Sequence, residues 1–465
     1  MLDEFRKIVG AQYVLTEPDM MAPYLRDWRG RYHGRALAVV KPDSTQAVAD
    51  IVKLCNQFQT SIVPQGGNTS LSGASVPDQS GRQLILNLSR LDRIREIDVL
   101  NQTMTVEAGC ILKTVQQAAE AVELFFPVSL AAEGSCTVGG NLSTNAGGTA
   151  VLRYGNMRDQ CLGLEVVLPN GQVWHGLRTL RKDNTGYALR DLLIGAEGTL
   201  GIITAAVLKL YPRPVAQVTA LIGLQHIASA VALLNFVKHH TGPCLTGFEL
   251  VSQACLDLVT DQFPQLTYPL STRHAQVVLL ELSGHESVQH TQQMLEQCLT
   301  QAYQQGMVQD VLLASSLAQA QHFWSLREHI PLAQARVGKN IKHDISLPIS
   351  SIPAFCEAAE QTLHHVYPGC RIFAFGHLGD GNLHYNVAPP VAVEDTHFLR
   401  EEDAINQLVY QCVETHHGSI SAEHGIGQLK RAQLQRHKSQ VELNLMRSIK
   451  HAFDPQGIMN PGKVL

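Results

Sequence analysis

The sequence of 465 residues lacks a basic run, a long apolar run and a signal-type N-terminus. It has no cluster of lysine and arginine, and its net charge of -5 at pH 7 argues against a nucleic-acid partner. No apolar stretch approaches the ~18 residues that a membrane-spanning helix needs. The first residues include acids and no apolar region, so we expect neither a signal peptide nor a transit peptide.

Closely spaced cysteines are also missing. Ten cysteines are scattered along the chain without any C-x-x-C pair, so neither an iron–sulfur cluster nor a cysteine-based zinc site is expected. Reduced, mostly buried thiols fit a cytoplasmic protein. Apolar residues make up 45% and charged residues 17%, as in an ordinary globular protein. Since single cores stop growing near ~250–300 residues, we expect more than one domain.

What the sequence does contain is a pair of histidines around a glycine-rich turn in residues 371–387. His377 and His384 flank a Gly-Asp-Gly-Asn turn between two strand-like runs, and a hairpin there would bring the two imidazoles together. About forty residues on, Glu423 and His424 lie between small residues. Two imidazoles and one carboxylate are a ligand set used by zinc and similar ions. The alternative is a polar turn with exposed histidines.

Two stretches are rich in glycine. Residues 129–148 contain five glycines and no lysine, arginine or aromatic residue, which permits close backbone approach to a flat or phosphorylated ligand. A flexible surface loop is the alternative. Residues 64–70 form a second glycine-rich turn after a short strand. The longer stretch has neither GxGxxG nor the P-loop pattern, so a nicotinamide Rossmann site or a Walker ATPase is not supported.

The apolar periodicity predicts α+β structure in two halves separated near Pro212 and Pro214. In the second half, helices alternate with strands, which indicates a sheet covered on one face, of ferredoxin-like type. The helices expected there span 226–240, 285–305, 316–338, 351–365, 397–416 and 434–453. The expected strands span 275–282, 307–313 and 341–347, followed by the histidine hairpin.

Six motifs occur in one order along nearly the whole chain: PQGGNTS, TVGGNLSTNAGG, GAEGTLGII, GHLGDGNLH, SAEHGIG and FDPQGIMNPGK. With them the chain resembles the FAD-linked oxidases of the vanillyl-alcohol-oxidase/PCMH superfamily. Within that superfamily it is similar to the D-2-hydroxyacid dehydrogenases, which include D-lactate dehydrogenase, the glycolate oxidase FAD subunit and D-2-hydroxyglutarate dehydrogenase. The resemblance implies a PCMH-type FAD-binding domain (1–214), a ferredoxin-like substrate or cap domain (215–420) and a C-terminal helical segment (421–465) that packs on the FAD domain.

The resemblance also implies which residues bind FAD. They lie in the glycine-rich stretches and the C-terminal tail: Pro64, Gly66, Gly67, Asn68, Thr69, Ser70, Glu133, Gly134, Thr137, Gly139, Gly140, Asn141, Ser143, Thr144, Asn145, Gly147, Gly148, Glu197, Gly198, Gly201, Ile202, Ile203 and Asn460. Some relatives attach the flavin to a histidine where this sequence has Asn68, so we expect non-covalent FAD. Asn460 would reach back to the flavin ring.

For the metal and the substrate, the resemblance implies a divalent ion, zinc in the first instance, held by His377, His384 and Glu423. His424 matches the proposed catalytic base. The matched substrate contacts are Arg327, Lys342 and Asn386. Without the resemblance, Arg327 could be a solvated helix residue and Lys342 could face water. Relatives specialised for D-2-hydroxyglutarate have a hydroxyl residue where this chain has Pro331, which puts recognition of a distal carboxylate in doubt.

The expected activity is FAD-dependent oxidation of a D-2-hydroxy acid, with D-2-hydroxyglutarate and D-lactate as candidates. Without a nicotinamide site, electrons would leave to an electron-transfer flavoprotein, a quinone or a cytochrome, or to oxygen. One alternative is a metal-free flavin oxidase or alkyl-transfer enzyme, and another is a flavin-binding subunit of a larger glycolate-oxidase-like complex. A homodimer is one expected assembly of the protein.

Overall fold

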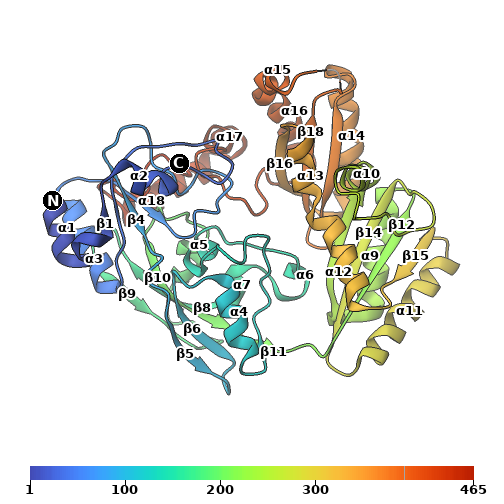
Figure 1. The fold of residues 1–465 in the computed structure, drawn as a ribbon, viewed down its shortest axis with the longest axis horizontal. Coiled ribbons are helices and arrows are strands. Elements are labelled where there is room, and N and C mark those ends of the chain that lie inside the picture. Colours follow the sequence, from blue (N-terminus) through green and yellow to red (C-terminus); the bar gives the residue numbers. More distant parts are fainter. Residues whose placement is uncertain (392) are drawn as a thin grey trace. The chain divides into compact units, whose positions relative to one another are not determined.

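The computed structural model describes residues 1–391 and 393–465, which form two compact units whose elements are labelled in Figure 1. Unit 1 comprises Met1–Gly148, Gly155–Arg213 and Glu423–Leu465, and unit 2 comprises Thr149–Tyr154 and Pro214–Ala422. Within the described residues, the cysteines are free thiols and most are buried. Among the helices described, none is both long enough and apolar enough to cross a membrane.

Unit 1 is built on two sheets and a short two-stranded ladder. The first sheet has the order β1-β2-β4-β3 and pairs β2, β4 and β3 in parallel, whereas the second, β5-β6-β10-β8-β9, is antiparallel throughout. The strands are β1 (Val14–Leu15), β2 (Ala36–Val40), β3 (Ile62–Gln65), β4 (Gln83–Asn87), β5 (Ile94–Asp98), β6 (Thr103–Glu107), β8 (Cys161–Val167), β9 (Val173–Gly176) and β10 (Ile202–Lys209), with β7 (Leu124–Phe125) paired to β11 (Tyr211–Pro212).

The helices of unit 1 are short except for two. They are α1 (Leu2–Val9), α2 (Pro18–Met21), α3 (Thr45–Gln57), α4 (Leu112–Glu120), α5 (Val138–Ser143), α7 (Met157–Gln160), α8 (Leu189–Leu193), α17 (Arg431–His437) and α18 (Gln440–Phe453). Helix α3 begins where the Ser44 hydroxyl accepts a hydrogen bond from the Ala47 N–H. The single helix predicted over 434–453 is wrong, because a capping box between Ser439 and Glu442 starts a new helix there.

Unit 2 contains one antiparallel sheet of seven strands in the order β15-β12-β14-β13-β17-β18-β16. Its strands are β12 (Ala216–Leu224), β13 (Leu245–Ser252), β14 (Gln276–Gly284), β15 (Asp310–Leu313), β16 (Ile341–Ser346), β17 (Arg371–His377) and β18 (Asn382–Ala388). Its helices are α6 (Val151–Tyr154), α9 (Ile227–Thr241), α10 (Gln253–Gln262), α11 (Val288–Gln304), α12 (Leu317–Glu328), α13 (Ile330–Val337), α14 (Ile352–Val366), α15 (Asp395–Phe398) and α16 (Glu402–Thr415).

This sheet is covered on both faces, so the predicted cover on one face is wrong. Alternate residues of β14 belong to two separate cores: Val278 and Leu280 pack with α9, α11, α14 and α16, whereas Val277 and Leu279 pack with α10, α12 and α13. A strand with both faces buried has a continuous apolar run rather than an alternating pattern. The run Val277–Leu280 is such a case, so it was a signal of the second layer that the prediction did not use.

Two predicted helices of unit 2 are each divided. The segment 316–338 forms α12 and α13, which meet at His329 because Pro331 has no N–H to donate and cannot continue a helix from α12. The segment 397–416 forms α15 and α16 with a short 3-10 turn between them. Helices α12 and α13 both cover the face of the sheet that carries the candidate site residues.

Candidate FAD pocket and metal-binding cluster

A pocket in unit 1 is lined by most of the residues predicted to bind FAD. It contains the turn 64–70, the first turns of α5 and the loop before β10. The predicted residues found there are Pro64, Gly66, Gly67, Asn68, Thr69, Ser70, Thr137, Gly139, Gly140, Asn141, Ser143, Thr144, Glu197, Gly198, Gly201, Ile202 and Ile203. Apolar groups such as Leu88, Leu130 and Ala132 complete the lining, and Glu423 and His424 also contribute to it.

The lining fits a large ligand that is bound mainly through backbone groups. Thr137 projects a buried hydroxyl that has no hydrogen-bond partner within the described part of the chain. The turn at Gly67 packs so closely that an added Cβ would lie 1.9 Å from the Ser135 carbonyl oxygen. A turn with few side chains lets phosphate oxygens approach backbone N–H groups, which is how glycine-rich turns hold a pyrophosphate. These features suit FAD.

Six of the predicted FAD residues do not line the pocket: Glu133, Gly134, Asn145, Gly147, Gly148 and Asn460. The Glu133 carboxylate instead accepts hydrogen bonds from Lys113 and Gln116. Asn460 is buried, and its amide donates to the carbonyls of Ala74 and Glu197. Its Oδ1 has no partner among the residues described. Their predicted contact with FAD stays a prediction.

Glu197 connects this pocket to the Glu423–His424 segment within unit 1. Its two carboxylate oxygens accept the N–H groups of Ile426 and Gly427 at 2.7 and 2.8 Å. Burial raises the pKa of Glu197, and these N–H groups only partly offset that effect. The Ser72 hydroxyl also donates to the His424 carbonyl at 3.1 Å. The backbone is therefore held at His424 and directly after it.

In unit 2, strand register puts the remaining candidate side chains on one face of the sheet. Residues directly opposite in an antiparallel ladder share a face. The opposed pairs are Glu249 and His377, Phe375 and His384, His384 and Asp344, Phe373 and Asn386, and Asn386 and Lys342. This is the face covered by α12 and α13, because Phe373 and Phe375 pack with residues of both helices. Arg327 extends from α12 onto this face.

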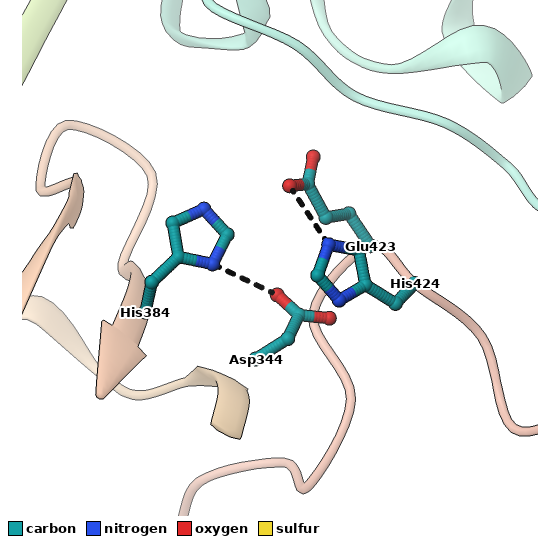
Figure 2. Close-up of side chains that lie close together, drawn as sticks. All are labelled: Asp344, His384, Glu423 and His424. Atoms are coloured by element: carbon teal, nitrogen blue, oxygen red, sulfur yellow. Dashed lines mark ion pairs between the residues drawn. The ribbon is translucent and has the colours of Figure 1, made fainter. Parts of the chain in front are cut away.

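A cluster of ligand atoms forms where the chain leaves unit 2. The Ala422 N–H donates to the Asp344 carboxylate at 3.2 Å, and Glu423 is the next residue. One atom each from Asp344, His384, Glu423 and His424 lies within 4.8 Å of the others. Figure 2 shows His384 beside Asp344, with Nδ1 3.9 Å from Oδ1, and His424 beside Glu423, with Nε2 3.8 Å from Oε1. Two imidazoles and two carboxylates are a donor set that fits zinc or manganese.

His377 lies outside this group of four. Its ring centroid is 5.9 Å from that of His384, and its Nδ1 is 2.5 Å from Glu249 Oε1. The other oxygen of Glu249 accepts from Arg327 Nε at 2.7 Å, and the Arg327 guanidinium lies over the Phe375 ring. Burial opposes ionisation of Glu249, but the electrostatic attraction and hydrogen bonds of its partners His377 and Arg327 outweigh burial and lower the pKa of Glu249 to about 2.

The remaining predicted substrate contacts lie near α13. The Asn386 amide is buried and donates to Gln334 Oε1 at 2.9 Å. Gln334 is fully buried, and its Nε2 has no hydrogen-bond partner among the described residues. Pro331 is exposed at the start of α13. The polar group that α13 presents to the site face is therefore Gln334. Lys342 lies opposite Asn386 in the ladder.

Sequence reasoning did not single out Asp344, Glu249 or Gln334. The sequence did contain evidence that Asp344 lies at the site, because Asp344 comes two residues after Lys342 in a predicted strand and so shares its face. Glu249 also had a usable signal, since a charged residue inside an apolar strand is seldom buried without a partner. Gln334 had none, because its burial depends on the helix break at His329.

Each half of the chain matches a known protein family. Residues 36–176 match the family described as the FAD binding domain, and residues 213–464 match the C-terminal domain of FAD linked oxidases. The chain is 38% identical to D-2-hydroxyglutarate dehydrogenase of Xanthomonas citri pv. viticola over 461 residues, covering 99% of this chain and 95% of that protein. It is 33% identical to D-2-hydroxyglutarate–pyruvate transhydrogenase of Saccharomyces cerevisiae over 471 residues, covering 99% and 93%.

Among solved structures, p-cresol methylhydroxylase has a similar fold, with a TM-score of 0.76 and 17% identity, covering 100% of this chain and 96% of that one. This similarity confirms the predicted fold class of a PCMH-type FAD-binding domain with a second α+β domain. The chain belongs to the FAD-linked oxidase family, in its D-2-hydroxyacid dehydrogenase group.

Proposed function

We propose that this protein oxidises a D-2-hydroxy acid to the 2-oxo acid, with FAD and a divalent cation bound at the sites described. The observation that carries this proposal is that Glu423 and His424 line the glycine-rich pocket and also belong to the cluster with Asp344 and His384. Two adjacent residues that belong to both the FAD pocket and the metal-binding cluster suit a reaction that needs both cofactors. The names of the bacterial and yeast relatives support the substrate class.

In the reaction the substrate hydroxyl loses a proton, C2 loses a hydride and the C–O bond becomes a carbonyl. When bound, FAD supplies the hydride acceptor, and a divalent cation supplies the positive charge that lowers the hydroxyl pKa. His424 takes up the hydroxyl proton on its neutral imidazole. Arg327 binds the C1 carboxylate through the guanidinium nitrogens that Glu249 leaves unused.

The residues that would hold the cation are His377, His384 and Glu423, as predicted, with Asp344 as an additional oxygen donor. Asp344 is buried, and its Oδ1 accepts a hydrogen bond from Asn382 at 3.0 Å, which fixes the orientation of the carboxylate. Two carboxylates near one divalent ion balance its charge in a buried site. Zinc is the first metal to test, followed by manganese.

FAD would be bound without a covalent bond. An amide is not a nucleophile towards the flavin, and the Asn68 side chain is already engaged. Its Nδ2 donates to the Arg26 carbonyl and its Oδ1 accepts from Ser75, both at 2.8 Å. Denaturing the protein with acid should release all of the flavin into solution.

A panel of D- and L-2-hydroxy acids tests the activity. Under anaerobic conditions we expect D-2-hydroxyglutarate or D-lactate to bleach the flavin absorbance and L-lactate to leave it unchanged. A metal chelator should slow the bleaching at least ~10-fold, because positive charge near a reacting oxygen contributes several kcal/mol. If L-lactate bleaches the flavin faster than every D-acid, the proposed stereochemistry is wrong.

Gln334 should select for a substrate with a second polar group. Its buried Nε2 can donate to a distal carboxylate, a role that the exposed Pro331 cannot fill. A hydrogen bond to a charged group contributes ~1.5–3 kcal/mol, so Gln334→Leu should lower kcat/KM for D-2-hydroxyglutarate ~10–100-fold. D-lactate has no distal carboxylate, so kcat/KM for D-lactate should change less than ~3-fold.

The matched control is Gln321→Leu, which changes an exposed glutamine of α12. If Gln334→Leu lowers kcat/KM equally for D-2-hydroxyglutarate and D-lactate, Gln334 acts only by orienting Asn386.

The route by which electrons leave the reduced flavin is also proposed. An electron-transfer flavoprotein, a quinone and a cytochrome are the first candidates, and oxygen is another. The name of the yeast relative adds pyruvate, a 2-oxo acid, as an acceptor to include in the same assays.

A further inference from the structure

We infer that Glu249 is a positioning residue that sets the tautomer of His377 for metal binding and fixes Arg327 for the substrate carboxylate. The inference rests on the proposed function and names a residue that the chemistry above does not use directly. Its basis is one buried carboxylate shared between two candidate site residues. Glu249, His377 and Arg327 all lie in unit 2.

The geometry divides the two oxygens of Glu249 between two partners. Oε1 is 2.5 Å from His377 Nδ1, and Oε2 is 2.7 Å from Arg327 Nε. The Glu249 side chain is 1% exposed and each partner side chain is 11% exposed, so water competes little for these contacts. Glu249 and His377 are also direct partners in the β13–β17 ladder, which fixes their separation through the backbone.

The contact with His377 determines which ring nitrogen carries the proton. A carboxylate only accepts hydrogen bonds, so Nδ1 must be the protonated nitrogen that donates to it. In a neutral imidazole, Nε2 then has the lone pair that a cation needs. Histidines that bind metals commonly donate their other N–H to a carboxylate, which fixes the ring and increases its basicity.

The contact with Arg327 has a different effect. It uses the Nε–H and leaves the two terminal nitrogens, which together can form a bidentate pair with a carboxylate. The guanidinium is also held over the Phe375 ring, 4.9 Å from its centroid. Phe375 lies directly opposite His384 in the β17–β18 ladder, so the arginine is kept close to the histidine hairpin.

The test is Glu249→Gln in the FAD-loaded protein, measured by Zn²⁺ titration against a competing chromophoric chelator. Glutamine keeps the volume, but it has one acceptor oxygen where glutamate has two. When that oxygen accepts from Arg327, the amide N–H faces His377 Nδ1 and favours the tautomer that protonates Nε2. We expect Zn²⁺ affinity to fall ~10–100-fold, as for other changes in groups that support metal ligands. Excess Zn²⁺ should restore the rate of flavin reduction.

The matched control is Glu281→Gln. Glu281 is a partly buried carboxylate on the neighbouring strand β14, and it accepts hydrogen bonds from Trp324 and Thr246 instead of the site residues. The Glu281→Gln protein should bind Zn²⁺ with wild-type affinity. Wild-type Zn²⁺ affinity in a folded, FAD-loaded Glu249→Gln protein would overturn the inference and leave the proposed function intact. A wild-type protein that binds no Zn²⁺ would overturn both.

Glu249→Asp provides a second test should the glutamine variant not fold. Aspartate keeps the charge, but its side chain is one methylene shorter and cannot reach both partners. We expect Zn²⁺ affinity at least ~3-fold below wild type, and unchanged affinity would overturn the inference here as well.

Discussion

Replacing His384 with alanine is expected to abolish substrate-dependent flavin reduction while the protein keeps its full content of FAD. His384 is one of the two imidazoles proposed to hold the cation, and it lies in the cluster with Asp344, Glu423 and His424. Losing a nitrogen donor leaves mainly oxygen donors, which bind zinc less well than a mixed set. The cation is expected to contribute ~3 kcal/mol or more to the reaction, so the rate should fall at least ~100-fold. Glu423→Gln should have a comparable effect.

Flavin absorbance, metal content and the anaerobic rate of bleaching should be measured on the same sample. His365→Ala is the control, because it removes an exposed histidine of α14 from the same unit. It should retain the wild-type rate and metal content. Wild-type turnover in His384→Ala or His377→Ala with undisturbed flavin absorbance would rule out the metal role of that histidine.

Local features of the site were predictable from the sequence. The hairpin over 371–387 forms as β17 and β18, because glycines in the turn and apolar runs on both sides of it favour that structure over others. It brings the rings of His377 and His384 within 5.9 Å, centroid to centroid. The glycine-rich turn 64–70 lines a pocket for the equally local reason that it has few side chains.

Contacts between distant segments were not predictable in this way. Glu249 precedes its partner His377 by 128 residues, and nothing in the spacing of the two residues pairs them. The pairing follows from the position of β13 next to β17, which is set by the whole sheet order. The second helical layer did have a local signal, the continuous apolar run Val277–Leu280, but a short run of this kind does not show which helices cover each face.

The backbone at Gly67 should be essential for FAD. Gly67→Ala is expected to reduce FAD content at least ~10-fold in the purified protein. The new Cβ would lie 1.9 Å from the Ser135 oxygen and 3.2 Å from the Cys136 Cα, and both are backbone atoms that cannot rotate away. The turn 64–70 would therefore have to move, and with it a wall of the pocket. Visible absorbance relative to protein concentration measures the loss.

Two other glycine-to-alanine variants serve as comparisons for Gly67→Ala. Gly66→Ala should have a smaller effect, because its Cβ would meet the Thr137 hydroxyl at 2.2 Å and that side chain can rotate. Gly134→Ala should retain FAD, since Gly134 does not line the pocket and an added Cβ meets no atom within 4 Å in the described structure. Thermal unfolding of all three variants separates loss of FAD from loss of the fold. A folded Gly67→Ala protein with stoichiometric FAD would mean that this turn does not hold the cofactor, and the pyrophosphate would then have to be sought among the other pocket residues.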